Sequence, residues 1–126
     1  MARRTGYELV FYQDAVGRQP VREWLRNDLS PEQRRTVGAA MRQLLQEQGM
    51  GVCGSSFGRQ LGEGLFEFRL REEGLLVRIF CHAYGDRLIL LLGAYDKGRD
   101  PSERRQNREI SKARARLREW QSRQRS

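Results

Sequence analysis

The sequence has few of the residues that build disulfide-stapled or metal-holding proteins. Its 126 residues include only two cysteines, Cys53 and Cys81, and a single histidine. The cysteines lack the spacing of a metal site or of a redox motif. A chain of this length can bury a core without disulfides. We therefore expect no disulfide and no cysteine-held metal, which suits a reducing cytoplasm.

Long apolar segments are also missing. Residues 1–6 lack the apolar stretch that follows the charges of a signal peptide. The longest apolar run, residues 88–95, is far short of the roughly 20 residues of a membrane-spanning helix. Since internal repeats and linkers are absent too, we expect a single domain over residues 1–126, located in the cytoplasm and without membrane contact.

Lysine is scarce, so the cations are mostly arginine, and the net positive charge lies mainly at the C-terminal end. Of 24 cations 22 are Arg, and the net charge is +8. Residues 101–126 hold nine cations and three carboxylates, a net of +6. Guanidinium groups bind phosphate in a bidentate fashion, so a polyanion is the natural partner. An arginine bias can equally follow from coding composition.

Periodicity and turn residues predict the order β-α-α-β-β-β-α. The expected elements are a strand over residues 7–12, helices beginning at Pro20 and Pro31, strands over 66–71, 76–82 and 87–92, and a basic helix over about 101–121. Ser30 and Gln33 form a capping box, and Asp100 is the expected cap of the last helix. Residues 49–64, with six glycines, are expected as an irregular loop, and residues 121–126 as a frayed end. The predicted fold class is α+β, a small antiparallel sheet with the two N-terminal helices packed on one face and a C-terminal helix that docks through Ile110, Ala113, Leu117 and Trp120.

Alternation along two strands separates their side chains onto two faces. The apolar set, which must face the helices, is Phe66, Phe68, Leu70, Val77, Ile79 and Cys81. The opposite, open face then carries Arg69, Arg71, Arg78, His82 and the Phe80 ring. Arginines and an aromatic ring on an open sheet face suit a single-stranded nucleic acid. Exposed strand faces are also often charged for solubility alone.

The stretch "LLLGAYDKGRDPS" (90–102) leads from an apolar strand directly into charged residues. Such a strand is expected at the centre of the sheet. Its last residues, Tyr95, Asp96 and Lys97, together with Arg99, would then lie at the rim of the basic face. Sites are commonly built in this way, on rigid but solvent-accessible ends.

Four blocks resemble a known family. They are "YQDAVGRQPVREWL" (12–25), "RQLGEGLFEFRLR" (59–71), "LLVRIFCHAYGDRLILLLGAYDKG" (75–98) and "DPSERRQNREISKARARL" (100–117). In this order and spacing, over residues 7–117, the chain resembles bacterial RelE/ParE-type toxins of type II toxin–antitoxin systems, in their phage-derived HigB-like branch. The resemblance implies the RelE-like fold.

The resemblance also implies an activity. Such toxins are mRNA interferases, metal-independent endoribonucleases that cut mRNA on the ribosome, stop translation and arrest growth. The 2′-hydroxyl attacks the adjacent phosphorus and expels the 5′-oxygen. The implied partners are mRNA, the ribosome and a cognate helix-turn-helix antitoxin, and no metal or organic cofactor is expected.

Roles for individual residues follow from the same resemblance. Arg69 and Arg78 would clamp the scissile phosphate and stabilise its added charge, and Lys97 would assist at the phosphate or the leaving oxygen. Tyr95 would stack on or orient a base. Arg59 and Arg99 would grip the flanking backbone. Strand alternation, rather than the resemblance, adds Arg71 and Phe80 as further RNA contacts. His82 and Asp96 are the candidate general bases, although Asp96 is as readily an ion-pair partner of Lys97.

Position 96 departs from the branch, which often has a lysine pair where this sequence has Asp96-Lys97. The loss of one cation weakens the expectation of cleavage. One alternative is therefore a nucleic-acid-binding module without catalysis. The other, suggested by ParE-type relatives, is a non-cleaving toxin that acts on DNA gyrase.

Overall fold

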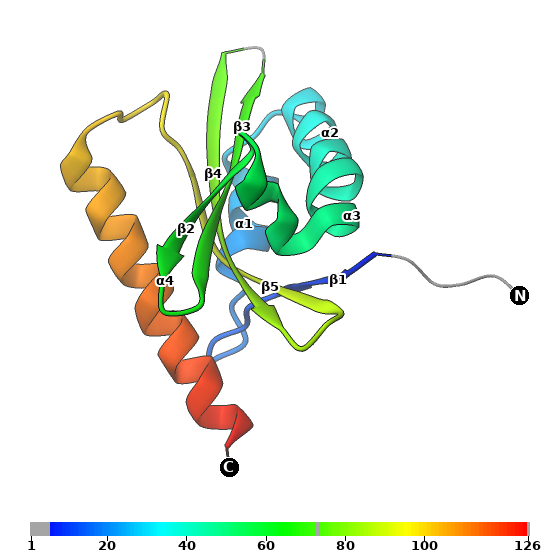
Figure 1. Ribbon diagram of the computed structural model, residues 1–126. Coiled ribbons are helices and arrows are strands. Elements are labelled where there is room, and N and C mark those ends of the chain that lie inside the picture. The colour runs from blue at the N-terminus through cyan, green and yellow to red at the C-terminus, as the bar shows by residue number, and fades with distance from the viewer. Residues whose placement is uncertain (1–5, 73, 126) are drawn as a thin grey trace, which may run out of the picture.

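A computed structural model of the chain describes residues 6–72 and 74–125. The elements in chain order are β1 (Glu8–Phe11), α1 (Pro20–Asn27), α2 (Pro31–Ala40), the π-helical η1 (Met41–Leu45), α3 (Gln46–Gln48), the 3-10 helix η2 (Gly49–Gly54), β2 (Gly58–Gly62), β3 (Leu65–Glu72), β4 (Leu75–Tyr84), β5 (Leu88–Asp96) and α4 (Glu103–Gln124). Figure 1 shows the sheet with α4 on one side and α1 and α2 on the other. The predicted α+β class is confirmed.

The five strands form one mixed sheet in the order β1-β5-β4-β3-β2. Strands β2 to β5 pair antiparallel with their neighbours, whereas β1 pairs parallel with β5. The sheet is thus not wholly antiparallel as expected, because the helical connection after β1 lets the first strand lie beside the last in the same direction. The predicted central position of the apolar strand 87–92 is confirmed, since β5 lies between β1 and β4.

The glycine-rich segment 49–64 is ordered, and the prediction of an irregular loop is wrong. It contains η2 and the edge strand β2. Gly58 begins β2 where the backbone of η2 passes very close. A Cβ on Gly58 would stand 2.7 Å from the carbonyl carbon of Val52 and 2.8 Å from the backbone nitrogen of Cys53. Glycine here permits a close chain crossing rather than a mobile loop.

The helix ends are partly as predicted. The capping box is confirmed, because the Ser30 hydroxyl accepts from the backbone N–H of Gln33 and the Gln33 side chain accepts from that of Ser30. The cap of α4 is Ser102, whose hydroxyl accepts from the Arg105 N–H at 3.1 Å. Asp100 instead accepts from the Ser102 N–H. The helix continues to Gln124, so fraying from residue 121 is wrong for the described residues.

Each face of the sheet carries its own core. The predicted apolar set, Phe66, Phe68, Leu70, Val77, Ile79 and Cys81, is buried with residues of α1 and α2. On the opposite face a second core joins Leu65, Phe80, Leu90, Leu92 and Tyr95 to Ala113 and Leu117 of α4. The face expected to be open is therefore largely covered by α4. The exposed position predicted for the Phe80 ring is wrong, since it is 0% exposed.

Arginines of α4 help to fix the helix on that face. Arg114 donates to the carbonyls of Leu61 and Gly62, and Arg116 donates to the carbonyl of Leu92 at 2.9 Å. The predicted docking of the helix through its apolar seam is confirmed at Ala113 and Leu117, which are buried. Part of the basic character of the C-terminal helix thus serves attachment to the sheet.

Candidate functional site

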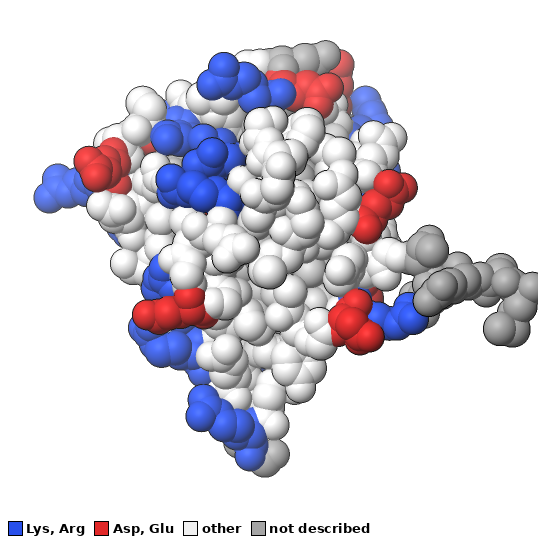
Figure 2. All heavy atoms as spheres, viewed as in Figure 1, with Lys and Arg blue, Asp and Glu red and all other residues white. Residues whose placement is uncertain are grey.

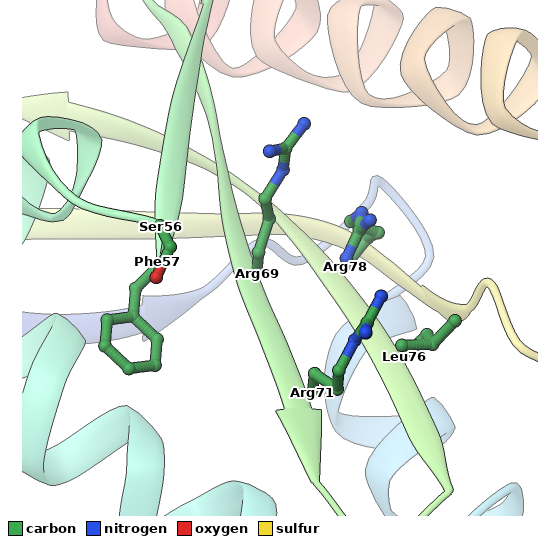
Figure 3. Close-up of a pocket in the computed structure, with 6 residues that line it drawn as sticks. All are labelled: Ser56, Phe57, Arg69, Arg71, Leu76 and Arg78. Atoms are coloured by element: carbon green, nitrogen blue, oxygen red, sulfur yellow. The ribbon is translucent and has the colours of Figure 1, made fainter.

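Arg69 and Arg78 stand directly opposite each other on the antiparallel strands β3 and β4. Together with Arg71 they project to the same side of the hairpin, as Figure 3 shows. Pairing at a single register position puts two guanidinium groups within reach of one ligand. The predicted placement of these three arginines on one face is confirmed.

These arginines line an open cavity of about 380 Å³. Its lining residues are Ser56, Phe57, Arg69, Arg71, Leu76 and Arg78. Ser56 and Phe57 come from the turn between η2 and β2, so the glycine-rich segment forms one wall. Figure 2 shows a group of basic side chains over the upper part of the sheet, beside the loop that leads to α4.

A buried carboxylate lies among the guanidinium groups. Glu67 is 0% exposed, and its oxygens lie 3.0 Å from Nε of Arg69, 3.4 Å from Nε of Arg78 and 3.7 Å from Nε of Arg59. Strand geometry explains the arrangement. Arg59 is opposite Glu67 on β2, Arg69 is two residues along β3, and Arg78 is the diagonal neighbour on β4. We call these four residues the Glu67 cluster.

The charges of this region do not cancel. Within residues 6–72 and 74–125, Glu67 is the one carboxylate that pairs with Arg59, Arg69 and Arg78, and Arg71 adds a fourth positive charge at the cavity. Burial lowers the pKa of Arg78, and the negative charge of Glu67 opposes that shift. Two buried atoms of the cluster, Oε1 of Glu67 and Nε of Arg78, have no hydrogen-bond partner despite their proximity. An added anion would meet an excess of donors and positive charge here.

Lys97 follows β5 and is held beside the cavity by its backbone. Its N–H donates to the carbonyl of Leu76, a lining residue, at 2.8 Å. The backbone after β5 thus lies beside β4 at the cavity, although Lys97 is not among the lining residues. The lysine predicted to assist at the phosphate is next to a wall of the cavity.

Tyr95 does not border the cavity as an accessible ring, and that prediction is wrong. The side chain is 0% exposed, stacked beside Phe80, with the Arg105 guanidinium 5.2 Å from the centre of its ring. Its hydroxyl has no hydrogen-bond partner, and burial raises its pKa. Neither Tyr95 nor Phe80 is therefore available to stack on a base in this structure.

Asp96 and Arg99 serve the turn after β5. Asp96 accepts from the backbone N–H groups of Leu76 at 3.1 Å and Gly98 at 2.9 Å. Its ion-pair partner is Arg99, at 3.7 Å, rather than Lys97. Arg99 also donates to the carbonyl of Asp28. Both side chains line a separate pocket with Trp24 of α1, and neither lines the arginine cavity.

His82 lies at the far end of β4. It is four residues from Arg78, roughly 13 Å along an extended strand. Its Nδ1 is 2.8 Å from the carbonyl oxygen of Gly64, and its ring meets Trp120 edge-on. A separate cavity includes His82, Tyr84 and Trp120. The structure therefore does not bring the predicted histidine to the arginines.

Sequence reasoning missed the role of Glu67 and the wall formed by Ser56 and Phe57. The first had a signal, because Glu67 and Arg69 are two residues apart on a strand and must share a face. The burial of that carboxylate depended on the pairing of β3 with β2 and β4, which brings Arg59 and Arg78 against it. No pattern in the glycine-rich segment indicated which of its residues would reach the arginines.

Fold and site define the chain as an α+β protein with an arginine-lined surface cavity built on a mixed sheet. The chain belongs to the family described as phage-derived protein Gp49-like (DUF891), whose profile matches residues 23–118. This family is associated with toxin–antitoxin modules. A search of the curated proteins found no match to the chain.

Two further features concern metals and membranes. Within the described residues no three side chains of His, Cys, Asp or Glu lie together as a metal site would require. No helix in the same part of the chain combines the length and apolar character needed to cross a bilayer.

Proposed function

We propose that the chain is the toxin of a toxin–antitoxin pair, of the RelE/ParE type and its HigB-like branch, and that it cleaves mRNA on the ribosome. The observation that carries the proposal is the pairing of Arg69 with Arg78 across β3 and β4, in a cavity with excess positive charge. The association of the Gp49-like family with toxin–antitoxin modules supports it.

The chemistry needs electrostatic stabilisation more than a protein nucleophile. The O2′–P bond forms while the P–O5′ bond breaks, which leaves a 2′,3′-cyclic phosphate and a 5′-hydroxyl. The 2′-hydroxyl proton passes to water, and Lys97 supplies a proton to the 5′-oxygen. Arg69 and Arg78 bind the non-bridging oxygens, whose charge increases in the transition state. Ammonium and guanidinium groups suit this role without a metal.

Cleavage is tested with a translating extract in which mRNA 5′ ends are mapped. The wild-type chain should produce new ends that carry a 5′-hydroxyl. Arg69→Ala and Arg78→Ala should each reduce cleavage by about 100-fold, the usual effect of removing one group that stabilises the transition-state charge. Arg18→Ala is the matched control, because Arg18 pairs with Glu23 on the exposed surface. Equal loss in the control, or no cut ends with the wild type, would contradict the proposal.

A specific observation favours a second candidate, an RNA-binding protein that does not cleave. Of the residues predicted to move protons or orient a base, His82 and Asp96 are engaged elsewhere and Tyr95 is buried. This candidate predicts salt-sensitive binding to RNA that weakens on Arg78→Ala, without cut mRNA. Inhibition of DNA supercoiling with intact mRNA would instead indicate a gyrase-directed toxin.

A further inference from the structure

Helices α1 and α2 lie on the opposite side of the sheet from α4 (Figure 1), and residues of both line a second basic region. It is a groove of about 380 Å³ lined by Phe11, Arg22, Leu25, Arg26, Arg34, Arg35, Gly38 and Arg42. We call it the α1–α2 groove. None of these residues lines the arginine cavity of the proposed active site. The groove is therefore separate from the proposed active site.

The helix periodicity explains how the groove forms. Arg22, Leu25 and Arg26 are three and four residues apart, so they share one face of α1. Gly38 and Arg42 are likewise four residues apart, on α2 and the start of η1. Both helix faces line the groove, and its five arginines, which we call the rim, are exposed.

The floor of the groove is apolar. Phe11 and Leu25 are partly buried and pack against the core on this side of the sheet. Gly38 leaves open space, since a Cβ there would have only the Arg42 Nη1 atom within 4 Å, at 3.5 Å. An apolar floor open to solvent costs free energy in proportion to its area. Filling it with an apolar side chain of a partner would be favourable.

The rim carries positive charge without internal compensation. Within residues 6–72 and 74–125, none of the five arginines makes an ion pair with a carboxylate. Arg34 donates to the carbonyls of Leu25 and Arg26 at the end of α1, and Arg22 donates to Gln19. These contacts orient the guanidinium groups but leave their charge unpaired. A partner with carboxylates would match this rim.

We propose that the α1–α2 groove binds an acidic amphipathic helix of a protein partner. One apolar stripe of such a helix would cover Phe11, Leu25 and the space at Gly38, and acidic residues beside the stripe would pair with the arginines. Nucleic acid fits less well, because a sugar–phosphate backbone uses the rim but not the apolar floor. This inference does not rest on RNA cleavage, since the two sites share no residue.

The test measures binding of a fluorescent 18-residue peptide, with Leu at helical spacing and Glu beside it, to the full chain by anisotropy. The comparison ligands are a peptide of the same composition in scrambled order and a 12-base-pair RNA duplex. The amphipathic peptide should bind at least 10-fold more tightly than the scrambled one. Equal affinity for the two peptides, or no binding of either, would overturn the proposal.

Two variants examine floor and rim separately. Gly38→Leu fills the floor from a helical position where a side chain meets only a flexible arginine, so the fold should persist or gain stability. It should weaken binding of the amphipathic peptide at least 10-fold and leave RNA binding unchanged. Arg26→Glu with Arg35→Glu should weaken the peptide similarly, whereas Arg69→Ala should not. If these charge reversals weaken binding of the RNA duplex more than binding of the peptide, the groove is an RNA surface and the proposal is wrong.

Discussion

The carboxylate of Glu67, fully buried beneath the arginine cavity, lies 3.0 Å from Nε of Arg69. The same group also faces Arg59 and Arg78, so one negative charge holds three positive ones that would otherwise repel each other. A buried charge of this kind is costly unless it is paired. The arrangement keeps the guanidinium groups together before any ligand arrives.

Replacement of that carboxylate should weaken the fold. Glu67→Gln keeps the shape but leaves the arginines uncompensated, so we expect a loss of about 2 to 4 kcal/mol in the free energy of unfolding. The expected loss is smaller than for a fully buried ion pair, because the side chains of Arg59 and Arg69 are partly exposed to water. Urea unfolding measures it, with the exposed Glu72→Gln as control. Sulfate should restore part of the loss, and equal stability of the two variants would contradict the role of Glu67.

Removal of the buried hydroxyl of Tyr95, unlike replacement of Glu67, should not weaken the fold. The hydroxyl has no hydrogen-bond partner, and an unpaired buried polar group is unfavourable. Tyr95→Phe should therefore be as stable as the wild type or up to about 1 kcal/mol more stable. RNA binding and cleavage should stay within about twofold. A large loss of cleavage without loss of stability would restore Tyr95 as a functional residue.

Gly58 supports the wall of the cavity that carries Phe57. Because a Cβ would stand 2.7 Å from the Val52 backbone, Gly58→Ala must displace η2 or β2. We expect a cost of about 1 to 3 kcal/mol, as in other overpacked sites, together with weaker RNA binding. Gly54→Ala is the matched control, since a Cβ there meets nothing within 4 Å. Thermal unfolding of both variants provides the comparison.

Tyr12 connects β1 to the end of α4 and should make stability depend on alkaline pH. Its hydroxyl donates to Glu119, and burial followed by this bond raises its pKa from 10.0 to about 12. The folded state thus holds the proton more tightly than the unfolded state. The contribution is complete below pH 10 and is lost as the pH rises toward 12. Compared with the wild type, Tyr12→Phe should be less stable at pH 8 and should lose less stability between pH 10 and 12. The measurement is urea unfolding of both proteins across this pH range. An equal loss of stability in the wild type and Tyr12→Phe would contradict the role of Tyr12.

Much of the secondary structure could be predicted because it depends on local chemistry. The Ser30 capping box and the alternation from Phe66 to Arg71 fix backbone conformation within a few residues. Strand β2 was not predicted, since it is short and begins and ends with glycine, although only Glu63 and Gly64 separate it from its partner β3. Its glycines indicated a loop, whereas Gly58 is required by a close contact.

The positions of the candidate site residues were also only partly predictable from the sequence. Arg69 and Arg78 were predicted on one face from strand periodicity, and both line the cavity. Tyr95 and Phe80 share that face but are buried, because the apolar seam of α4 packs over them. His82 also satisfies the periodicity, yet position along the strand separates it from the arginines. Periodicity specifies a face of the sheet but not which part of that face stays open.

The sequence by itself determined the element types outside residues 49–64, the α+β class and the common orientation of the β3 and β4 arginines, because dihedral preference and period-two geometry act over a few residues. Only the tertiary structure decided where α4 lies, which aromatic rings it buries, and that Glu67 gathers Arg59, Arg69 and Arg78. The packing of α4 depends on contacts between segments far apart in the chain, and the Glu67 cluster depends on the pairing of three consecutive strands. Their free energies are realised only when the whole sheet and its covering helices assemble.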